Sequence, residues 1–135
     1  MISFDGDCRQ AIGFYSKVFG AEVQGVMTYA EAPPSSGYDV PEADKDRIMY
    51  SSIEIHGVTV MLMDYPSGTP VVIGDNISPT ITSTDMDEIR RLFDALGAGG
   101  EVGMELQQMF YSDLYGMVTD RFGVNWQLVH DSGKY

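Results

Sequence analysis

One stretch of the sequence decides the fold: Tyr115-Gly116-Met117-Val118-Thr119-Asp120-Arg121-Phe122-Gly123-Val124-Asn125-Trp126. It predicts a strand over Tyr115–Thr119, a tight turn at Gly123 and a second strand over Val124–His130. A second hairpin of this type lies 66 residues earlier, with strands over Ile48–Ile55 and Val58–Asp64 joined by a tight turn at His56-Gly57. The offset of 66 sets Glu54 on Asp120, Gly57 on Gly123, Val58 on Val124 and Leu62 on Leu128.

Each half also carries one amphipathic helix before its hairpin. Apolar residues at helical spacing predict helices over Cys8–Phe19 and Met86–Leu96. Asp7 is the expected N-cap of the first helix, and Thr84 or Asp85 that of the second. An offset of 77 aligns the two helices, setting Ile12 on Ile89, Tyr15 on Leu92, Phe19 on Leu96 and Gly20-Ala21 on Gly97-Ala98.

The remaining apolar segments complete two repeats of the same order. Strands are predicted over Ile2–Asp5, Glu22–Tyr29, Ile77–Thr82 and Glu101–Leu106. The loop from Ala30 to Arg47, rich in proline and acidic residues, absorbs the difference of 11 between the two offsets. The sequence therefore predicts an α+β fold of two βαβββ modules, at about 1–66 and 75–131, within a single domain spanning 1–135.

Composition limits the partners of the chain. Its 135 residues are 44% hydrophobic and 21% charged, as in ordinary globular proteins. With 8 basic and 20 acidic residues, the net charge of −12 argues against nucleic-acid and membrane-surface binding. The run Val58–Met63 is too short to cross a bilayer, and the N-terminus does not read as a secretory signal. A single cysteine, Cys8, excludes an intrachain disulfide, and a cytoplasmic location is expected.

Four stretches resemble one protein family. They are Gly6 to Ala11 running into Phe14-Tyr15 and Val18-Phe19-Gly20; Ile48-Met49-Tyr50 with Val60 to Asp64; Gly74 to Ser78; and Met104 to Gln107 with Met109-Phe110, followed by Tyr115 to Trp126. Together they resemble the PhnB-like branch of the vicinal oxygen chelate superfamily, which includes glyoxalases, bleomycin-resistance proteins and extradiol dioxygenases. The resemblance implies that the two modules form a cupped, mostly antiparallel sheet, and that the protein is a homodimer.

The resemblance also locates the positions where metalloenzymes of this superfamily carry ligands. These enzymes place His or Glu on the first and last strand of each module. In this sequence the last-strand positions fall on Met61 and Gln127, and the first-strand positions fall near Ile77 or Ser78 and at or before Met1. None of these residues is His, Asp or Glu, so we expect no metal and no cofactor.

Other residues with catalytic or ligand chemistry have simpler interpretations. We expect His56 to be a solvated turn residue, His130 to lie at a surface or interface, and Asp64 to be a solvated strand end rather than part of the cup. Cys8 lies in the first turn of a helix, where a thiol pKa can fall, but a partly buried structural thiol is favoured. The acidic loop residues are expected to be solvated: Asp39, Glu42, Asp44 and Asp46.

Alternation along the closing strands separates two faces. One set is continuously apolar and is expected to pack on the helices: Val58, Val60 and Leu62, with Val124, Trp126 and Leu128. The other set is expected to line the concave face, and the candidate ligand-binding residues are Gln127, Met61, Met63, Asn125, Phe110 and Tyr115. Methionine adapts to varied apolar shapes, and the glutamine amide both donates and accepts. The alternative is that these side chains fill the space between the modules or a dimer interface.

Three functions remain open at this point. The first is a metal-independent, PhnB-like protein that binds a small, mostly apolar or aromatic molecule. The second is a metal-assisted lyase, isomerase or dioxygenase of the glyoxalase type, and the third is a protein whose dimer surface is its function. Some PhnB-like sequences also carry the name of a ubiquinone-pathway methyltransferase. No glycine-rich turn between a strand and a helix supports that chemistry, because Gly97, Gly99 and Gly100 follow a helix.

Overall fold

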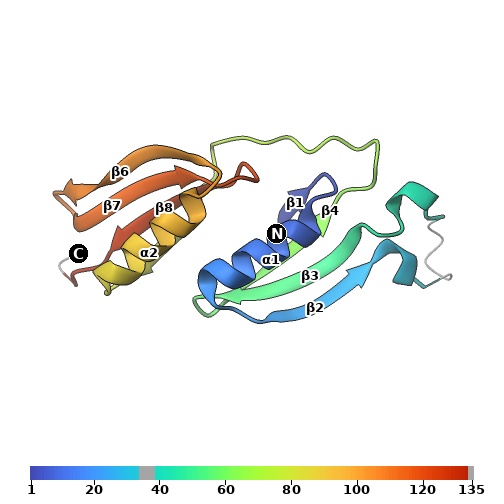
Figure 1. The fold of residues 1–135 in the computed structure, drawn as a ribbon, viewed down its shortest axis with the longest axis horizontal. Coiled ribbons are helices and arrows are strands. Elements are labelled where there is room, and N and C mark those ends of the chain that lie inside the picture. Colours follow the sequence, from blue (N-terminus) through green and yellow to red (C-terminus); the bar gives the residue numbers. More distant parts are fainter. Residues whose placement is uncertain (34–38, 134–135) are drawn as a thin grey trace. The chain divides into compact units, whose positions relative to one another are not determined.

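The computed structural model describes residues 1–33 and 39–133, which form two compact units, Met1–Val72 and Ile73–Tyr135. Each unit contains one helix and one four-stranded sheet (Figure 1). The elements of unit 1 are β1 (Ile2–Phe4), α1 (Cys8–Phe19), β2 (Val23–Thr28), the short 3₁₀ turns η1 (Tyr29–Glu31) and η3 (Glu42–Asp44), β3 (Ile48–Ile55) and β4 (Val58–Asp64). Those of unit 2 are β5 (Thr80–Ser83), α2 (Met86–Gly97), β6 (Glu101–Met109), β7 (Ser112–Thr119) and β8 (Asn125–His130).

The two sheets have the same topology. Their strand orders are β1-β4-β3-β2 and β5-β8-β7-β6. In each sheet the first strand of the unit pairs in parallel with the last strand, and the other pairs are antiparallel. The predicted α+β fold of two βαβββ modules, with mostly antiparallel pairing, is confirmed. That the units fold as a single domain stays a prediction.

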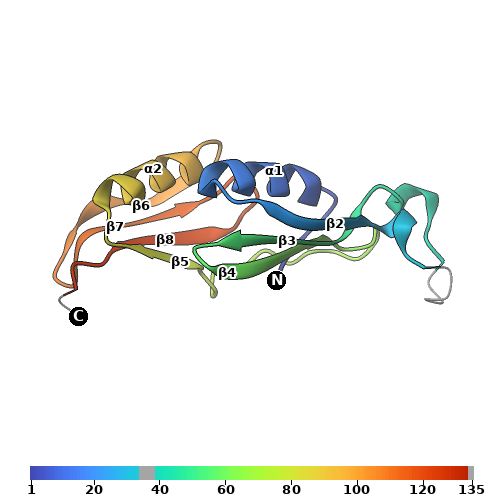
Figure 2. The same ribbon diagram turned by 90° about the horizontal axis from the view of Figure 1, so that it is seen from below.

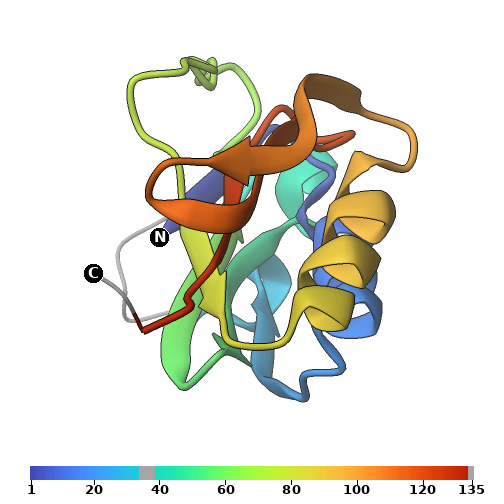
Figure 3. The same cartoon turned by 90° about the vertical axis from the view of Figure 1, so that its left-hand side faces the viewer.

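One face of each sheet is covered by the helix of the same unit (Figures 2 and 3). In unit 1 the fully buried core includes Tyr15 of α1, Ile53 of β3 and Leu62 of β4. In unit 2 the corresponding layer consists of Ile89, Leu92 and Leu96 of α2 against Val118, Trp126 and Leu128. A Cβ on Gly116 of β7 would lie 2.8 Å from Phe93 Cε2, so α2 approaches the sheet as closely as a glycine permits.

Several predicted boundaries are confirmed and others need correction. Strands β3 and β4 have the predicted limits, and their turn has positive φ at both His56 (49°) and Gly57 (77°), as in a type I′ hairpin. Strand β5 begins later than predicted, and Ile77 lies outside it with 79% of its surface exposed. Val58 was expected to pack under a helix but is 63% exposed, because it begins β4 beside the turn.

The two helices start in different ways. Asp85 caps α2 as predicted, and its carboxylate accepts hydrogen bonds from the backbone of Asp87 and Glu88. Asp7 is the N-cap residue of α1, as predicted, but its side chain makes no capping hydrogen bond. The carboxylate that caps α1 belongs instead to Asp64, at the end of β4.

Candidate functional site

The face of the unit 2 sheet that α2 leaves uncovered is the open face of unit 2. Along β8, half-buried Asn125, Gln127 and Val129 point to this face and alternate with the buried residues of the helix side. The pairing of β8 with β7 places Thr119, Met117 and Tyr115 beside them. Alternation therefore predicted the open-face positions of this strand correctly.

Two candidate residues of the open face are joined directly. The Tyr115 hydroxyl donates a hydrogen bond of 2.9 Å to Oε1 of Gln127. Tyr115 is only 8% exposed, and burial, with smaller contributions from the charge of Tyr111 and a hydrogen bond to it, raises the pKa of Tyr115 above its ordinary value. The phenol therefore stays protonated, and able to donate, at neutral pH.

A row of aromatic rings leads away from this pair. Tyr111 contacts Tyr115 edge-to-face at 5.6 Å between ring centroids, and Phe110 contacts Tyr111 in the same manner at 4.9 Å. Phe110 and Tyr111 form the two-residue turn between β6 and β7, and Phe110 is 86% exposed. Turns of this length usually carry glycine, asparagine or aspartate, so two aromatic residues here form an unusual apolar surface.

The side chain of Asn125 is hydrogen-bonded to other residues of unit 2. Its side-chain oxygen accepts a hydrogen bond of 2.6 Å from Thr119 Oγ1, and its amide nitrogen donates to the backbone oxygen of Gly74 at 3.2 Å. Both ends of the amide are thus engaged within unit 2. Asn125 thus holds the segment before β5 against the sheet, and its predicted role in ligand binding stays a prediction.

Met61 and Met63 belong to the open face of unit 1. They lie on β4, and Met61 pairs with Ser52 of β3. Met61 is 44% exposed, as are Tyr50 at 44% and Met27 at 39%, which pair with each other on the neighbouring strands. The open face of unit 1 is therefore a soft, methionine-rich surface, and the open face of unit 2 is aromatic with a central amide.

The strand register identifies the residues at the family's metal-ligand positions. Gln127 pairs with Thr80 of β5, so the first-strand position of unit 2 is Thr80, not Ile77 or Ser78. In unit 1, Ile2 pairs with Leu62, which sets Met1 beside Met61. Unit 1 offers two thioethers at these positions, and unit 2 offers one hydroxyl and an amide whose oxygen already accepts from Tyr115. Neither donor set fits a divalent transition metal.

The acidic and imidazole side chains of the described residues form no alternative metal site. Within residues 1–33 and 39–133, no three His, Cys, Asp or Glu side chains converge in a group that could hold a metal ion. His56 is exposed in its turn, as expected, and its ring contacts Phe19. His130 points away from Gln127, as predicted, but it is buried rather than at the surface, and its Nε2 lies 3.2 Å from the backbone oxygen of Thr84.

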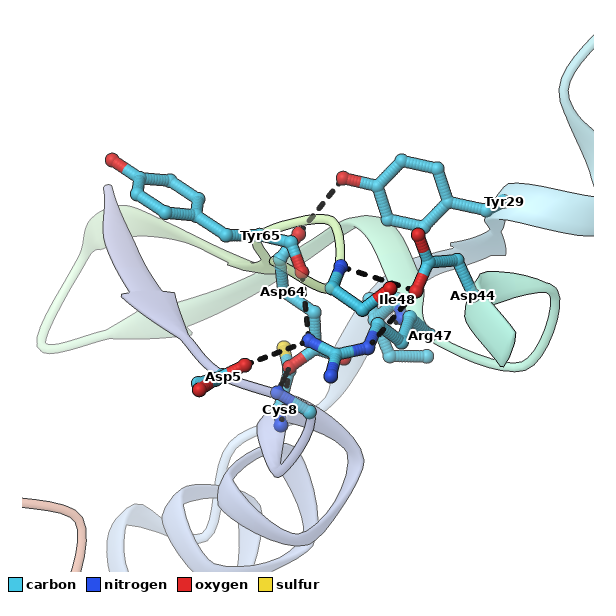
Figure 4. A network of polar contacts seen from close by, with 10 residues as sticks. Asp5, Cys8, Tyr29, Asp44, Arg47, Ile48, Asp64 and Tyr65 are labelled. Atoms are coloured by element: carbon cyan, nitrogen blue, oxygen red, sulfur yellow. Dashed lines mark hydrogen bonds and ion pairs between the residues drawn. The ribbon is translucent and has the colours of Figure 1, made fainter. Parts of the chain in front are cut away.

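Asp64 was predicted to be a solvated strand end, and that prediction is wrong. It is 1% exposed and faces the helix side, because it alternates in step with Leu62 (Figure 4). Its Oδ1 accepts hydrogen bonds from the backbone of Gly6 and Cys8 at the start of α1, and its Oδ2 accepts from Ile48. Asp64 therefore caps α1 from the last strand, and the same alternation could have shown that it does not reach the open face.

A second buried carboxylate also contradicts its prediction. Asp44 was expected to be solvated, but it is fully buried beside Arg47. Arg47 Nε lies 3.4 Å from Asp44, while its Nη1 donates to Asp5 at 3.0 Å and to the backbone oxygen of Tyr65 at 2.8 Å (Figure 4). The ion pair offsets the loss of hydration, so this side of unit 1 is a structural network. Its other acidic loop residues, Asp39, Glu42 and Asp46, are exposed as expected.

Cys8 and the glycine cluster are structural as well. Cys8 has no exposed surface, so it is more deeply buried than expected, and burial together with the nearby Asp64 charge raises the pKa of its thiol to about 12. Gly99 and Gly100 turn the chain from α2 into β6, where a Cβ on Gly100 would collide with Thr119 O. They therefore form a helix-to-strand turn and not the strand-to-helix turn of a nucleotide-type site.

Comparisons with known proteins agree on the family. The sequence profile of the glyoxalase/bleomycin resistance protein/dioxygenase superfamily matches residues 2–128. Protein YjdN from Escherichia coli K12 is 32% identical over 137 residues, which cover 94% of this chain and 90% of YjdN.

Solved structures support the same assignment. Protein PA1353 from Pseudomonas aeruginosa superposes with a TM-score of 0.84 at 29% identity, covering 95% of this chain and 92% of that one. A protein from Bacillus cereus, named PhnB and putative 3-demethylubiquinone-9 3-methyltransferase, has a TM-score of 0.78 at 23% identity, covering 95% and 94%, and shows the fold alone. Neither described helix has the length and apolar character needed to cross a membrane. The chain thus belongs to the glyoxalase/bleomycin resistance protein/dioxygenase superfamily, the vicinal oxygen chelate proteins, as a relative of YjdN.

Proposed function

We propose that this protein binds a small, mostly apolar or aromatic molecule on the open face of unit 2 and does so without a divalent metal. One observation carries the proposal: the position where metalloenzymes of the superfamily carry a glutamate holds Gln127, hydrogen-bonded to Tyr115. An amide already engaged by a phenol is a poor metal ligand but a good polar contact for an organic molecule.

The surroundings of Gln127 suit an aromatic ligand. Tyr115, Tyr111 and Phe110 present rings within edge-to-face distance of one another, and the exposed Phe110 supplies apolar surface that a ligand can bury. Met117 lies beside Gln127 on the same face. Apolar surface around a few polar groups is typical of small-molecule sites.

The open cleft of unit 1 is less suitable. It is lined by Asp5, Gly68, Thr69 and Pro70, and so offers no aromatic ring. Its one charged side chain, Asp5, is already paired with Arg47. The aromatic open face of unit 2 is therefore the better ligand site.

The proposal is tested on untagged protein by metal analysis and by thermal-shift screening of small aromatic compounds in EDTA. Binding should raise the melting temperature by mass action. Gln127→Ala should weaken a hit about tenfold to a hundredfold, because a buried hydrogen-bonding partner is lost, and should lower the free protein's melting temperature only modestly, because the Tyr115 hydroxyl loses its acceptor. Gln10→Ala, at an exposed position of α1, is the matched control and should leave binding unchanged.

Two results would overturn the proposal. One is about one equivalent of Zn, Ni, Mn or Fe in the purified protein, which would favour a metal-assisted enzyme of the glyoxalase type. The other is a Gln127→Ala variant that loses several degrees of melting temperature while keeping full affinity. Gln127 would then be a structural hydrogen-bonding residue.

We also propose that the protein acts as a homodimer. Strand β2 is an edge of its sheet, and its exposed apolar side chains, Val23, Val26 and Met27, favour burial against another chain. Light scattering at micromolar concentration should give twice the chain mass of 14.9 kDa. A single species at the chain mass would contradict the proposal.

A further inference from the structure

The hydrogen bond between Tyr115 and Gln127 has a direction. The phenol donates and Oε1 accepts, so the amide nitrogen occupies the opposite arm of the planar group. Among the described residues, Gln127 Nε2 has no hydrogen-bond partner within the protein. The two N–H bonds of this nitrogen are therefore the fully unengaged polar groups of Gln127, whereas one of the two lone pairs of Oε1 is already used by Tyr115.

The charges of unit 2 restrict the ligand further. Among its described residues the basic side chains are Arg90, Arg91 and Arg121. The first two lie on α2, which covers the other face of the sheet, and Arg121 lies in the β7–β8 turn, where Nη2 donates to Ala98 O. A carboxylate or phosphate on this open face would therefore lose hydration without gaining a cationic partner from unit 2.

We propose that Tyr115 is a specificity-determining positioning residue: it orients the Gln127 amide so that the site selects neutral or cationic aromatic molecules that carry a hydrogen-bond acceptor. This inference rests on the proposed function. Donor-bearing molecules are disfavoured because an N–H that faces the amide N–H groups leaves both unsatisfied, and because Oε1 already accepts from Tyr115 and has one lone pair left. Cationic rings are tolerated because aromatic faces attract positive charge.

The test uses bicyclic probes of similar size at pH 8 in EDTA, measured by calorimetry. Isoquinoline offers only an acceptor, indole only a donor and naphthalene neither. The wild-type protein should bind isoquinoline about tenfold more tightly than indole, since one mismatched buried hydrogen bond accounts for about that ratio. As a second pair, 2-naphthoate should bind at least about tenfold more weakly than the neutral 2-acetylnaphthalene of the same shape.

Tyr115→Phe separates orientation from structural support. Without the phenol the amide can rotate and present its oxygen, so indole should gain affinity and the isoquinoline-to-indole ratio should fall to within about threefold. A merely structural role would weaken both probes together and leave the ratio unchanged. Tyr50→Phe, on the open face of unit 1, is the control and should retain the wild-type ratio.

The outcomes distinguish this inference from the proposed function. If isoquinoline and indole bind equally to the wild-type protein, or if Tyr115→Phe retains the ratio, the inference is wrong while small-molecule binding stands. Tighter binding of 2-naphthoate than of 2-acetylnaphthalene would overturn the exclusion of anions. If none of the probes binds to the wild-type protein, the proposed function and the inference fail together.

Discussion

Units 1 and 2 have the same βαβββ topology but carry chemically different side chains at equivalent positions. Register aligns them, because Ile2 pairs with Leu62 as Ile81 pairs with Leu128. At the end of the last strand, Asp64 in unit 1 stands where His130 stands in unit 2, since they pair with Phe4 and Ser83 respectively. Each side chain contacts the chain where the helix of its unit begins. Asp64 accepts hydrogen bonds from backbone N–H groups, whereas His130 lies against the backbone oxygen of Thr84.

The open faces differ as well. The position that is Met61 in unit 1 is Gln127 in unit 2, each opposite the first strand of its unit or the residue before it. The two units therefore differ on both faces: in the buried group at the end of the last strand and in the side chain at the centre of the open face. The predictions below test this distinction, beginning with the largest expected effect.

The first prediction compares the two strand ends. Asp64→Ala leaves the backbone N–H groups of Gly6, Cys8 and Ile48 buried without an acceptor, and should lower the free energy of unfolding by about 3–4 kcal/mol. His130→Ala removes the contacts with Thr84 O at 3.2 Å and with Asp113 at 3.8 Å and should lower it by about 1–2 kcal/mol. Equilibrium unfolding in urea measures both. Equal losses would contradict the view that unit 1 depends on its carboxylate cap.

The second prediction concerns the network that unit 1 has and unit 2 lacks. Arg47→Met leaves the Asp44 carboxylate buried without its ion pair and should destabilise the protein by about 3 kcal/mol. Adding Asp44→Asn removes the unpaired charge, so the double variant should be more stable than Arg47→Met alone. Unfolding in urea checks this, and losses that simply add would show that the two side chains act independently.

The third prediction is the pH response of Cys8. An unfolded thiol ionises near its ordinary pKa of 9.0, whereas the folded thiol has a pKa of about 12. The thiol therefore contributes stability below pH 9 and loses that contribution as the pH rises above 9. Between pH 8 and pH 10, wild-type stability in urea should fall more than that of Cys8→Ser, whose hydroxyl does not ionise there. Parallel slopes would contradict the buried protonated thiol.

Local patterns explain which parts of the fold could be predicted from the sequence. The limits of β3 and β4 followed from alternation and from the His56-Gly57 turn, which act over a few residues. The roles of Asp64 and Asp44 could not be predicted in this way. Asp64 accepts from Gly6, 58 positions away, and Asp44 accepts from the backbone of Ser67, 23 positions away, so both roles depend on segments that only the folded chain brings together.

The candidate site could likewise be predicted only in part from the sequence. Alternation along β8 placed Gln127 on the open face, and the Tyr115 contact across the β7–β8 pair depends on register, which a sequence does not specify to the residue. The pairing of Thr80 with Gln127 was missed for this reason. Of the two hydrogen bonds of Asn125, the one with Thr119 is local, six residues away, whereas the one with Gly74 joins residues 51 positions apart and could not be predicted from a local pattern.

The central claim, metal-independent ligand contact at Gln127, is tested most directly by NMR titration of EDTA-treated, ¹⁵N-labelled protein with isoquinoline. The side-chain amide signals of Gln127 are identified by their absence in Gln127→Glu. The account predicts that these signals and the backbone amides of Tyr115 and Gly116 shift in proportion to bound isoquinoline, while the side-chain signals of Gln10 stay in place. Binding that leaves the Gln127 signals unmoved, or that appears only after a divalent metal is added, would contradict it.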